Sequence, residues 1–223
     1  MTTQVETERL PEVYEGQFGS FTIDQRDRQD VILYRAGLMV AALSFAIATL
    51  CVFLSAELAP QVATACYALM WLALGLSFFK IHIYLRSLHR ALQIFWAIGG
   101  IASVAIALIY PTPLALTAYQ QPLTILGMGF TFAALTGIFF KEAFCFNRLE
   151  TKFLVVIVPG LLLGHMAGLF SVATERSLLI AWALLFAVFA LRKVIQPVPP
   201  DIGDKSVFDY LEKEREKERQ QAA

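Results

Sequence analysis

Charged residues are scarce in this chain. They make up 16% of its 223 residues, whereas a soluble domain carries about a quarter. The 18 basic and 18 acidic residues balance to zero net charge, so no overall basic field argues for binding to nucleic acid. The charges gather at the two ends and in short islands between long apolar runs. This distribution is typical of a protein that partitions into a membrane.

Residues with familiar chemistry are also few. The three cysteines lie singly, without the close pairing of a zinc site, although Cys51 and Cys66 could face each other as free thiols or as a disulfide. The sequence has no Ser-His-Asp set, phosphate-binding glycine loop or bis-histidine haem motif. These absences disfavour the known enzyme chemistries. The lack of a carboxylate within the apolar runs also counts against a proton-coupled or sodium-coupled transporter.

Six apolar segments approach the length of about 20 residues that a helix needs to cross the hydrocarbon of a bilayer. The sixth is short, so we expect it to borrow flanking residues, with Arg192 and Lys193 reaching the lipid head groups. We predict an all-α six-transmembrane-helix bundle at 36–195, between tails at 1–35 and 196–223. The six segments are 36–56, 61–79, 91–110, 123–140, 153–172 and 177–191.

The basic residues predict an orientation, because short cytoplasmic loops retain lysine and arginine. Of the 18 lysines and arginines, Arg176 alone falls in the first, third or fifth connection. We therefore predict that both termini are cytoplasmic, or stromal if the membrane is a thylakoid rather than a plasma membrane. The chain opens on polar and acidic residues without a signal-peptide pattern, so we expect the first helix to direct insertion.

Both tails carry regular patterns. Residues 13–23 alternate apolar and polar side chains around two glycines, which favours a short hairpin over a helix. Thr22 or Asp24 is expected to cap the first helix, which can therefore start well before its apolar segment. Residues 206–221 predict a charged helix without an apolar stripe, which is either a solvated tail or a docking segment for a partner.

His165 is predicted near the middle of the fifth apolar segment, where a titratable group is a candidate for function. It could bind a metal or the magnesium of a pigment, or relay a proton. The alternative is a neutral histidine that hydrogen-bonds a neighbouring helix. Gly160, Gly164 and Gly168 recur every four residues and predict a flat strip for helix packing, with contact to a pigment or lipid as the alternative.

The second connection is basic and amphipathic. Apolar residues fall at helical spacing along 81–93, opposite His82, Arg86 and His89, and predict a helical extension. These three side chains could hold a lipid phosphate or an acidic partner. The arginine is equally explained by anchoring at the cytoplasmic face of the membrane, without any ligand.

The fourth connection, 141–152, mixes both charges around an aromatic-flanked cysteine. Glu142 is expected to pair with a neighbour of Lys141, or with Arg86 or Arg90 across the loops. Cys145 could be redox-active or acylated. Structural ion pairing and aromatic anchoring at the interface are the alternative for this segment.

Several stretches carry a resemblance to a known family. They are the GIFFKEAFCF run at 137–146, the LET triplet at 149–151, the glycine-rich segment with His165, and the EGQFGSF run at 15–21. Together they resemble an uncharacterised integral membrane protein family of cyanobacteria and plastids, a domain of unknown function. The resemblance covers most of the chain. It implies a photosynthetic membrane, and it assigns neither a mechanism nor a functional residue.

The sequence supports two functions of different kinds. The first is a non-enzymatic scaffold or assembly factor whose tails and glycine strips contact other membrane proteins, and which binds a pigment or lipid at His165. The second is an oligomeric channel or carrier for a small solute, with His165, His82 and Glu142 along its path. A metal-dependent enzyme that combines these residues with His89 ranks third, because His165 is predicted at a different depth from the others. The cofactor stays unknown.

Overall fold

The computed structural model describes residues 12–54, 57–83 and 85–221, apart from the side chains of residues 209, 215, 218 and 221. The chain divides into two compact units. The bundle unit is Leu33–Gln196, and the tail unit combines the residues up to Ile32 with those from Pro197 onward.

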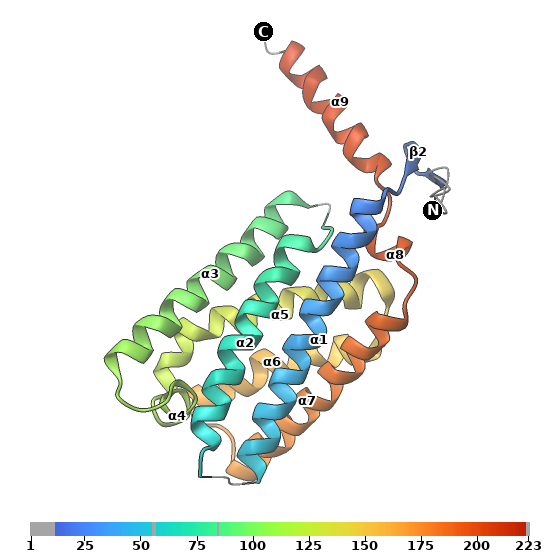
Figure 1. The fold of residues 1–223 in the computed structure, drawn as a ribbon. Helices are drawn as coiled ribbons and strands as arrows, with labels where there is room; N and C mark the ends of the chain where they lie inside the picture. Colours follow the sequence, from blue (N-terminus) through green and yellow to red (C-terminus); the bar gives the residue numbers. More distant parts are fainter. Residues whose placement is uncertain (1–11, 55–56, 84, 222–223) are drawn as a thin grey trace, which may run out of the picture. The chain divides into compact units, whose positions relative to one another are not determined.

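Six long helices cross the bundle unit (Figure 1). Each is long and apolar enough to span a membrane, which confirms the predicted number of spans by length and composition. A short helix, α4 (Leu114–Gln120), and a 3₁₀ turn at Pro122–Thr124 lie between the third and fourth of them. The six are α1 (Gln25–Phe53), α2 (Ala59–Lys80), α3 (Arg86–Ile109), α5 (Ile125–Phe146), α6 (Leu149–Met166) and α7 (Val172–Ile195).

The helices differ in their bounds from the predicted segments, and the ends of α5 and α6 show the physical reason. α5 continues past residue 140 to Phe146, and Asn147 then ends it in a left-handed conformation with φ 51°. α6 ends at Met166 instead of residue 172, because Gly168 adopts φ 65°. The N–H of Leu169 donates to the carbonyl of Gly164 and that of Gly168 to the carbonyl of His165, which is a Schellman termination. Hydropathy alone misses such caps.

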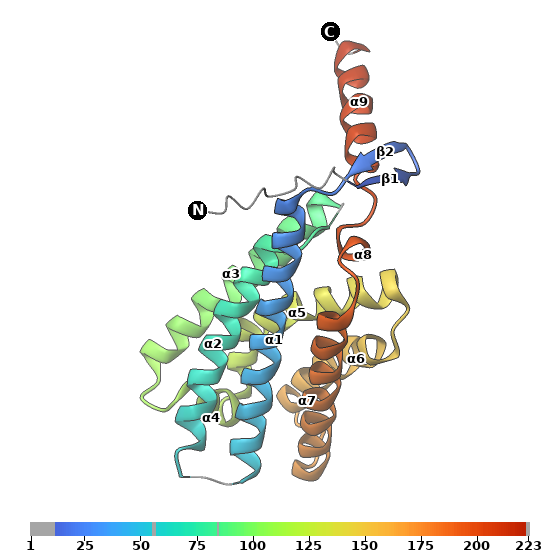
Figure 2. The same ribbon diagram turned by 45° about the vertical axis from the view of Figure 1, so that its right-hand side comes forward.

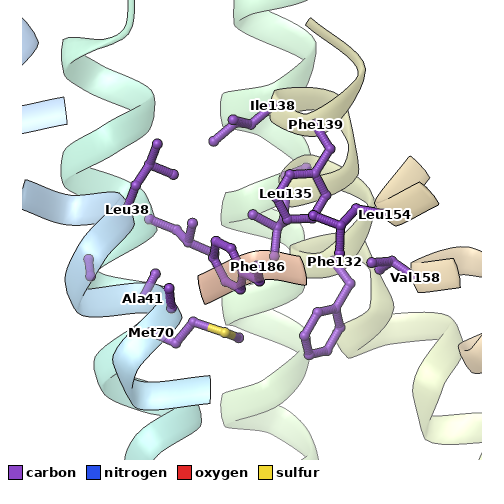
Figure 3. Close-up of a cluster of buried hydrophobic side chains, with 14 of the residues drawn as sticks. Leu38, Ala41, Met70, Phe132, Leu135, Ile138, Phe139, Leu154, Val158 and Phe186 are labelled. Carbon is purple, nitrogen blue, oxygen red and sulfur yellow. The ribbon is translucent and has the colours of Figure 1, made fainter. Parts of the chain in front are cut away.

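The core of the bundle is aromatic and aliphatic. Phe186 of α7 and Phe139 of α5 are both fully buried, with ring centroids 5.3 Å apart in an edge-to-face arrangement. α5 packs against both α3 and α6. Figure 3 shows this cluster, which also contains Leu38, Ala41, Met70, Phe132, Leu135, Ile138, Leu154 and Val158.

The outer surface of the bundle is apolar as well. Ile101, Val104 and Leu108 on α3 are between 61% and 83% exposed, far more apolar surface than a soluble monomer presents in one stretch. A lipid environment accounts for this surface, because hydrocarbon chains replace the missing protein neighbours. The structure therefore agrees with contact between the bundle and a bilayer.

The bundle has two ends, which we name by their connections. The first, third and fifth connections of the six long helices lie at the odd-loop end, which Figures 1 and 2 show at the bottom. The second and fourth connections lie at the opposite, even-loop end. The predicted orientation would place the odd-loop end outside the cytoplasm.

The tail unit contains the predicted hairpin and the predicted charged helix. β1 (Val13–Gly16) pairs antiparallel with β2 (Gly19–Thr22), α8 covers Pro199–Ile202, and α9 covers Ser206–Gln221. Phe18, at the hairpin turn, stacks on Tyr210 of α9 with ring centroids 4.2 Å apart. Stacking of this partly exposed aromatic pair holds the turn against the first residues of α9.

The start of α1 in the tail unit is a reciprocal cap. The N–H of Asp27 donates to Oδ1 of Asp24 at 2.8 Å, and the N–H of Asp24 donates to Oδ2 of Asp27 at 3.1 Å. This arrangement satisfies two backbone donors that a helix start leaves open. Asp24 is therefore the cap, and the first helix begins well before its apolar segment, as predicted.

Candidate functional site

A cavity of about 580 Å³ lies inside the bundle at the odd-loop end. Its volume falls in the range of about 300–1,000 Å³ that is usual for small-molecule sites. Most of the lining is aliphatic or aromatic, and it comes from α1, α2, α4, α5, α6 and α7. Representative lining residues are Phe45, Ala63, Met70, Leu114, Ala118, Met128, Phe132, Leu161, Leu179 and Trp182.

One polar wall interrupts this lining. Nδ1 of His165 lies 2.6 Å from Oε1 of Glu175, and its Nε2 lies 3.1 Å from the backbone carbonyl oxygen of Tyr119. The Tyr119 ring stacks on the imidazole at 5.1 Å. His165 thereby joins the end of α6, the start of α7 and the end of α4.

The sequence predicted His165 near the middle of its span, but the structure places it close to the end of α6. It is the second-last residue of α6, because the helix ends at Met166. The imidazole consequently borders the cavity near the odd-loop end. Its acidic partner Glu175, in the first turn of α7, was missed because it falls just outside the sixth apolar segment.

Arg176 lies at the rim of the cavity. It is exposed overall, and its guanidinium lies 5.9 Å from the ring centroid of Phe53. No carboxylate pairs with it among the residues that the structure describes. The sequence predicted Arg176 on the fifth connection, but α7 begins at Val172 and includes it. A cation with open donors thus borders an apolar cavity.

Deeper in the same cavity, polar groups are mostly satisfied. The hydroxyl of Tyr67 lies 2.7 Å from Oγ of Ser103 and 3.1 Å from Oγ1 of Thr131. Trp182 is 1% exposed and lines the cavity, and its Nε1 is buried without a hydrogen-bond partner. That N–H is a buried donor that no acceptor among the described residues satisfies.

A second cluster of charges is buried at the even-loop end. Nζ of Lys193 lies 2.8 Å from Oε2 of Glu142, and both side chains are 0% exposed. Nζ of Lys141 forms a second ion pair with Oε1 of Glu142 at 3.0 Å, and the hydroxyl of Tyr34 donates to the same oxygen at 3.1 Å. Nζ of Lys193 also lies 4.5 Å from the ring centroid of Phe146.

This pairing corrects two predictions. Lys193 does not extend to the lipid head groups, whereas its neighbour Arg192 is half exposed and reaches Oε2 of Glu150 at 3.1 Å. Glu142 lies within α5 and not in a loop, and its partners are Lys193 and Lys141 instead of the loop arginines. Because Lys193 lies on the buried face of α7, the Glu142 carboxylate supplies the opposite charge that a buried ammonium requires.

Other predicted side chains of the even-loop end stay separate from the cavity. Residues 81–83 and Leu85 are not helical, so the helical extension predicted for the second connection starts only at Arg86. Nε2 of His89 lies 2.6 Å from the carbonyl oxygen of Phe78, which ties the start of α3 to the end of α2. His82 lies in the non-helical stretch, and Cys145 is an exposed free thiol.

The predicted glycine strip on α6 is not a helix-packing strip within this chain. Gly160 is exposed, and an added Cβ would meet no atom within 4 Å. Gly164 faces the ring of Phe170, and Gly168 lies beyond the helix in the left-handed region. Close helix packing occurs on α3 instead, where Gly99 lies against the backbone of Thr131.

Cys51 and Cys66 are free thiols in the structure. Among the described residues, no three histidine, cysteine or acidic side chains gather closely enough to hold a metal ion. The four ligands considered for a metal-dependent enzyme are also divided between the two ends, with His165 at the odd-loop end and Glu142 and His89 at the other.

Comparison with known proteins assigns the family. The family model described as "Uncharacterized integral membrane protein (DUF2301)" matches residues 76–210, which run from the end of α2 to the start of α9. The chain belongs to this family. A relative from Haemophilus influenzae, described as "Uncharacterized protein", is 26% identical over 190 residues, covering 83% of this chain and 94% of the relative. No solved structure matches.

This membership confirms the resemblance to an uncharacterised integral membrane protein family. The Haemophilus influenzae relative shows that the resemblance extends beyond cyanobacteria and plastids, so the family does not restrict the chain to a photosynthetic membrane.

Proposed function

We propose that this chain is a non-enzymatic integral membrane protein that holds an amphipathic molecule, with its apolar tail in the cavity and its anionic head at Arg176. The observation that carries the proposal is the cavity itself, whose lining is mostly apolar and which is bordered by a cation that pairs with no carboxylate among the described residues. A phosphate or carboxylate head accepts several hydrogen bonds from a guanidinium, and an acyl tail fits an apolar lining.

The lipid alternative at His165 is favoured over the pigment alternative. An imidazole that ligates a metal needs a free lone pair, but both ring nitrogens of His165 already face partners, one on Glu175 and one on Tyr119. Binding of a pigment metal would have to break one of these contacts. A lipid tail requires no such change.

The role as scaffold or assembly factor rests on surfaces that are open to other membrane proteins. Gly160 is the clearest of these, since it lies exposed on α6 with free space above it. A helix of another protein could approach closely at this position. The bound amphiphile would then be a structural lipid of the assembly.

The test is mass spectrometry of amphiphiles that remain with the protein after purification in mild detergent. Ala118→Phe places a ring in the cavity and should remove most of the retained amphiphile, while Arg176→Gln should lower the share with an anionic head. Arg90→Gln removes an exposed arginine at the even-loop end, and it should change neither the amount of retained amphiphile nor the share with an anionic head. Retention that is the same in all four proteins would refute the proposal, provided that each variant keeps its helical circular dichroism.

A carrier for a small solute is the second candidate, and the arrangement of the two ends favours it. The cavity lies at the odd-loop end, the Glu142–Lys193 pair closes the even-loop end, and the rings of Phe139 and Phe186 lie in the core of the bundle. Alternating access in carriers needs a site that opens to one side of the membrane at a time. Uptake of a labelled solute into vesicles that hold the protein, and its loss on Ala118→Phe, would favour this candidate over a lipid-holding role.

A further inference from the structure

The carboxyl group of Glu175 has one engaged oxygen and one open oxygen. Its Oε1 lies 2.6 Å from Nδ1 of His165. Its Oε2 meets no hydrogen-bond donor among the residues that the structure describes, and it remains accessible. The side chain lines the cavity and is 16% exposed. Glu175 therefore offers an open acceptor beside the cavity without giving up its contact with His165.

An open cation follows this acceptor along the chain. Arg176 lines the same cavity, and its guanidinium pairs with no carboxylate among the described residues, Glu175 included. Consecutive side chains of a helix project about 100° apart, as 3.6 residues per turn requires. The two charged groups consequently lie side by side on the cavity wall without neutralising each other.

The depth of these two side chains suits the head of a lipid. α7 begins at Val172, so both belong to its first two turns at the odd-loop end. Charged side chains near the end of a spanning helix lie at the level of the lipid heads. The lining continues along α7 as far as Trp182, about 15 Å from Val172 at 1.5 Å per residue. An amphiphile with its tail in the cavity would place its head beside both charges.

We infer that the cavity selects a phospholipid whose head carries a primary ammonium beside its phosphate, as phosphatidylethanolamine does. Arg176 binds the phosphate, and Oε2 of Glu175 accepts a hydrogen bond from the ammonium. The inference rests on the proposed function, because it names the head of the amphiphile that the same cavity holds. Only two carbon atoms separate the charged groups of this head, so neighbouring side chains of opposite charge can meet both.

Other phospholipid heads match the pair of side chains less well. The choline head keeps the phosphate, but its nitrogen carries three methyl groups and no N–H, so it cannot donate to Glu175. The glycerol head keeps the phosphate and offers neutral hydroxyl groups, whose hydrogen bonds to a carboxylate are weaker than those of an ammonium. The head with a primary ammonium satisfies both side chains.

The experiment measures which phospholipids stay with the whole protein. The protein is reconstituted into vesicles of equal parts phosphatidylethanolamine, phosphatidylcholine and phosphatidylglycerol with identical acyl chains, then solubilised in mild detergent and analysed by mass spectrometry. Lipid on the outer surface of the bundle is subtracted with Ala118→Phe, which fills the cavity. In the remaining fraction we expect phosphatidylethanolamine to exceed phosphatidylcholine about tenfold, the preference that one charge-assisted hydrogen bond gives.

A methylated series separates hydrogen bonding from head size. Vesicles with N-methyl or N,N-dimethyl phosphatidylethanolamine present heads of increasing size that keep at least one N–H. We expect both to be retained much more strongly than phosphatidylcholine, because the donor is lost only with the last methyl group. Retention that falls evenly with each added methyl group would assign the selection to size and overturn the inference.

Variants of the two side chains assign the contacts. Glu175→Ala should make the retention of phosphatidylethanolamine and phosphatidylcholine equal, whereas Arg176→Gln should lower both together. Glu57→Ala is the matched control and should change neither, because Glu57 is exposed in the first connection and does not line the cavity. A preference that Glu175→Ala keeps, or a wild type that prefers phosphatidylglycerol, would overturn the inference in protein with unchanged helical circular dichroism.

The source of the head is tested with glycerophosphoethanolamine, which has the same head and no tails. An excess of it should leave the retained lipid in place. Displacement of the lipid would show a site for a free phosphoethanolamine compound and overturn the inference.

The proposed function and the inference fail separately. Retained lipid that Ala118→Phe removes, but that shows no preference among the heads, would sink the assignment of the head and leave the lipid-holding function in place. Retention that Ala118→Phe does not reduce would sink the lipid-holding function itself.

Discussion

Glu142 and Lys193 illustrate how single residues place charge inside an apolar bundle. An isolated charge in such surroundings is costly, but here each carries a partner, and Tyr34 and Lys141 add further contacts to the carboxylate. A buried pair of this kind contributes less to stability than its short distance suggests, because both ions lose their water. Removing one partner is far more damaging than removing both.

Lys193→Met should therefore lower the free energy of unfolding by about 3 kcal/mol, because it leaves Glu142 with one cation fewer in a buried site. The double variant Glu142→Gln with Lys193→Met should be more stable than the single variant, because it also removes the carboxylate that has lost its buried cation. Reversible unfolding in mixed detergent measures both. Lys152→Met, at an exposed lysine, is the matched control and should change little. A double variant that is less stable than the single one would contradict this account.

At the scale of elements, two tryptophans join α2 to α3. Nε1 of Trp71 donates to the carbonyl of Trp96 at 3.0 Å, and Nε1 of Trp96 donates to the carbonyl of Trp71 at 2.8 Å. Their rings stack with centroids 4.4 Å apart. Gly100 faces the Trp71 ring and Gly75 the Trp96 ring, so each glycine makes room for one indole.

Gly100→Ala should consequently destabilise the bundle by about 1–3 kcal/mol, because the new methyl group would collide with the Trp71 ring. Gly160→Ala is the matched control, since a methyl group there meets open space inside a helix and should be neutral or stabilising by up to about 1 kcal/mol. Thermal unfolding followed by circular dichroism measures both. Equal effects of the two substitutions would show that the indole pair does not constrain α2 and α3.

The hairpin and α9 of the tail unit are connected by Asp204. Its carboxylate accepts hydrogen bonds from the Ser206 hydroxyl and from the backbone N–H of Gln17, which lower the pKa of Asp204. Because the folded pKa is lowered, this contribution to stability is present above the usual value of about 4 and is lost as the pH falls through the folded pKa.

We therefore expect the Gln17 amide to be protected from hydrogen exchange near pH 7, and Asp204→Asn to reduce that protection. Glu212→Gln, at an exposed position of α9, should leave the exchange unchanged. Exchange of the Gln17 amide that Asp204→Asn does not accelerate would show that the carboxylate does not hold the turn.

At the scale of the whole molecule, the orientation in the membrane determines which side the odd-loop end and its cavity face. Lysine and arginine gather on the tails and the even connections, and the rule for basic loops places these in the cytoplasm. The cavity would then face the other side of the membrane.

A cysteine-free background with one new cysteine tests this orientation. Gln121→Cys, in the third connection, should react with a membrane-impermeant maleimide in intact cells, whereas Arg219→Cys, near the end of α9, should react only after lysis. Both positions are exposed, so accessibility differs by side alone. The opposite labelling pattern would reverse the orientation.

The sequence by itself determined the membrane class, the six spans, the hairpin and the charged helix, and it narrowed the cap of the first helix to Thr22 or Asp24. Each of these follows from hydropathy, alternation or capping chemistry, which act between residues that are close along the chain. His165 was also recognised as a candidate from its residue type, although its depth was wrong.

Only the tertiary structure decided which distant side chains meet. Glu175 reaches His165 because Gly168 ends α6 early, and Lys193 reaches Glu142 because α7 packs its buried face on α5. The cavity likewise depends on α4 folding back against α2. Such pairings arise from the packing of helices that are remote in the sequence, and apolar periodicity does not specify which partner a helix selects.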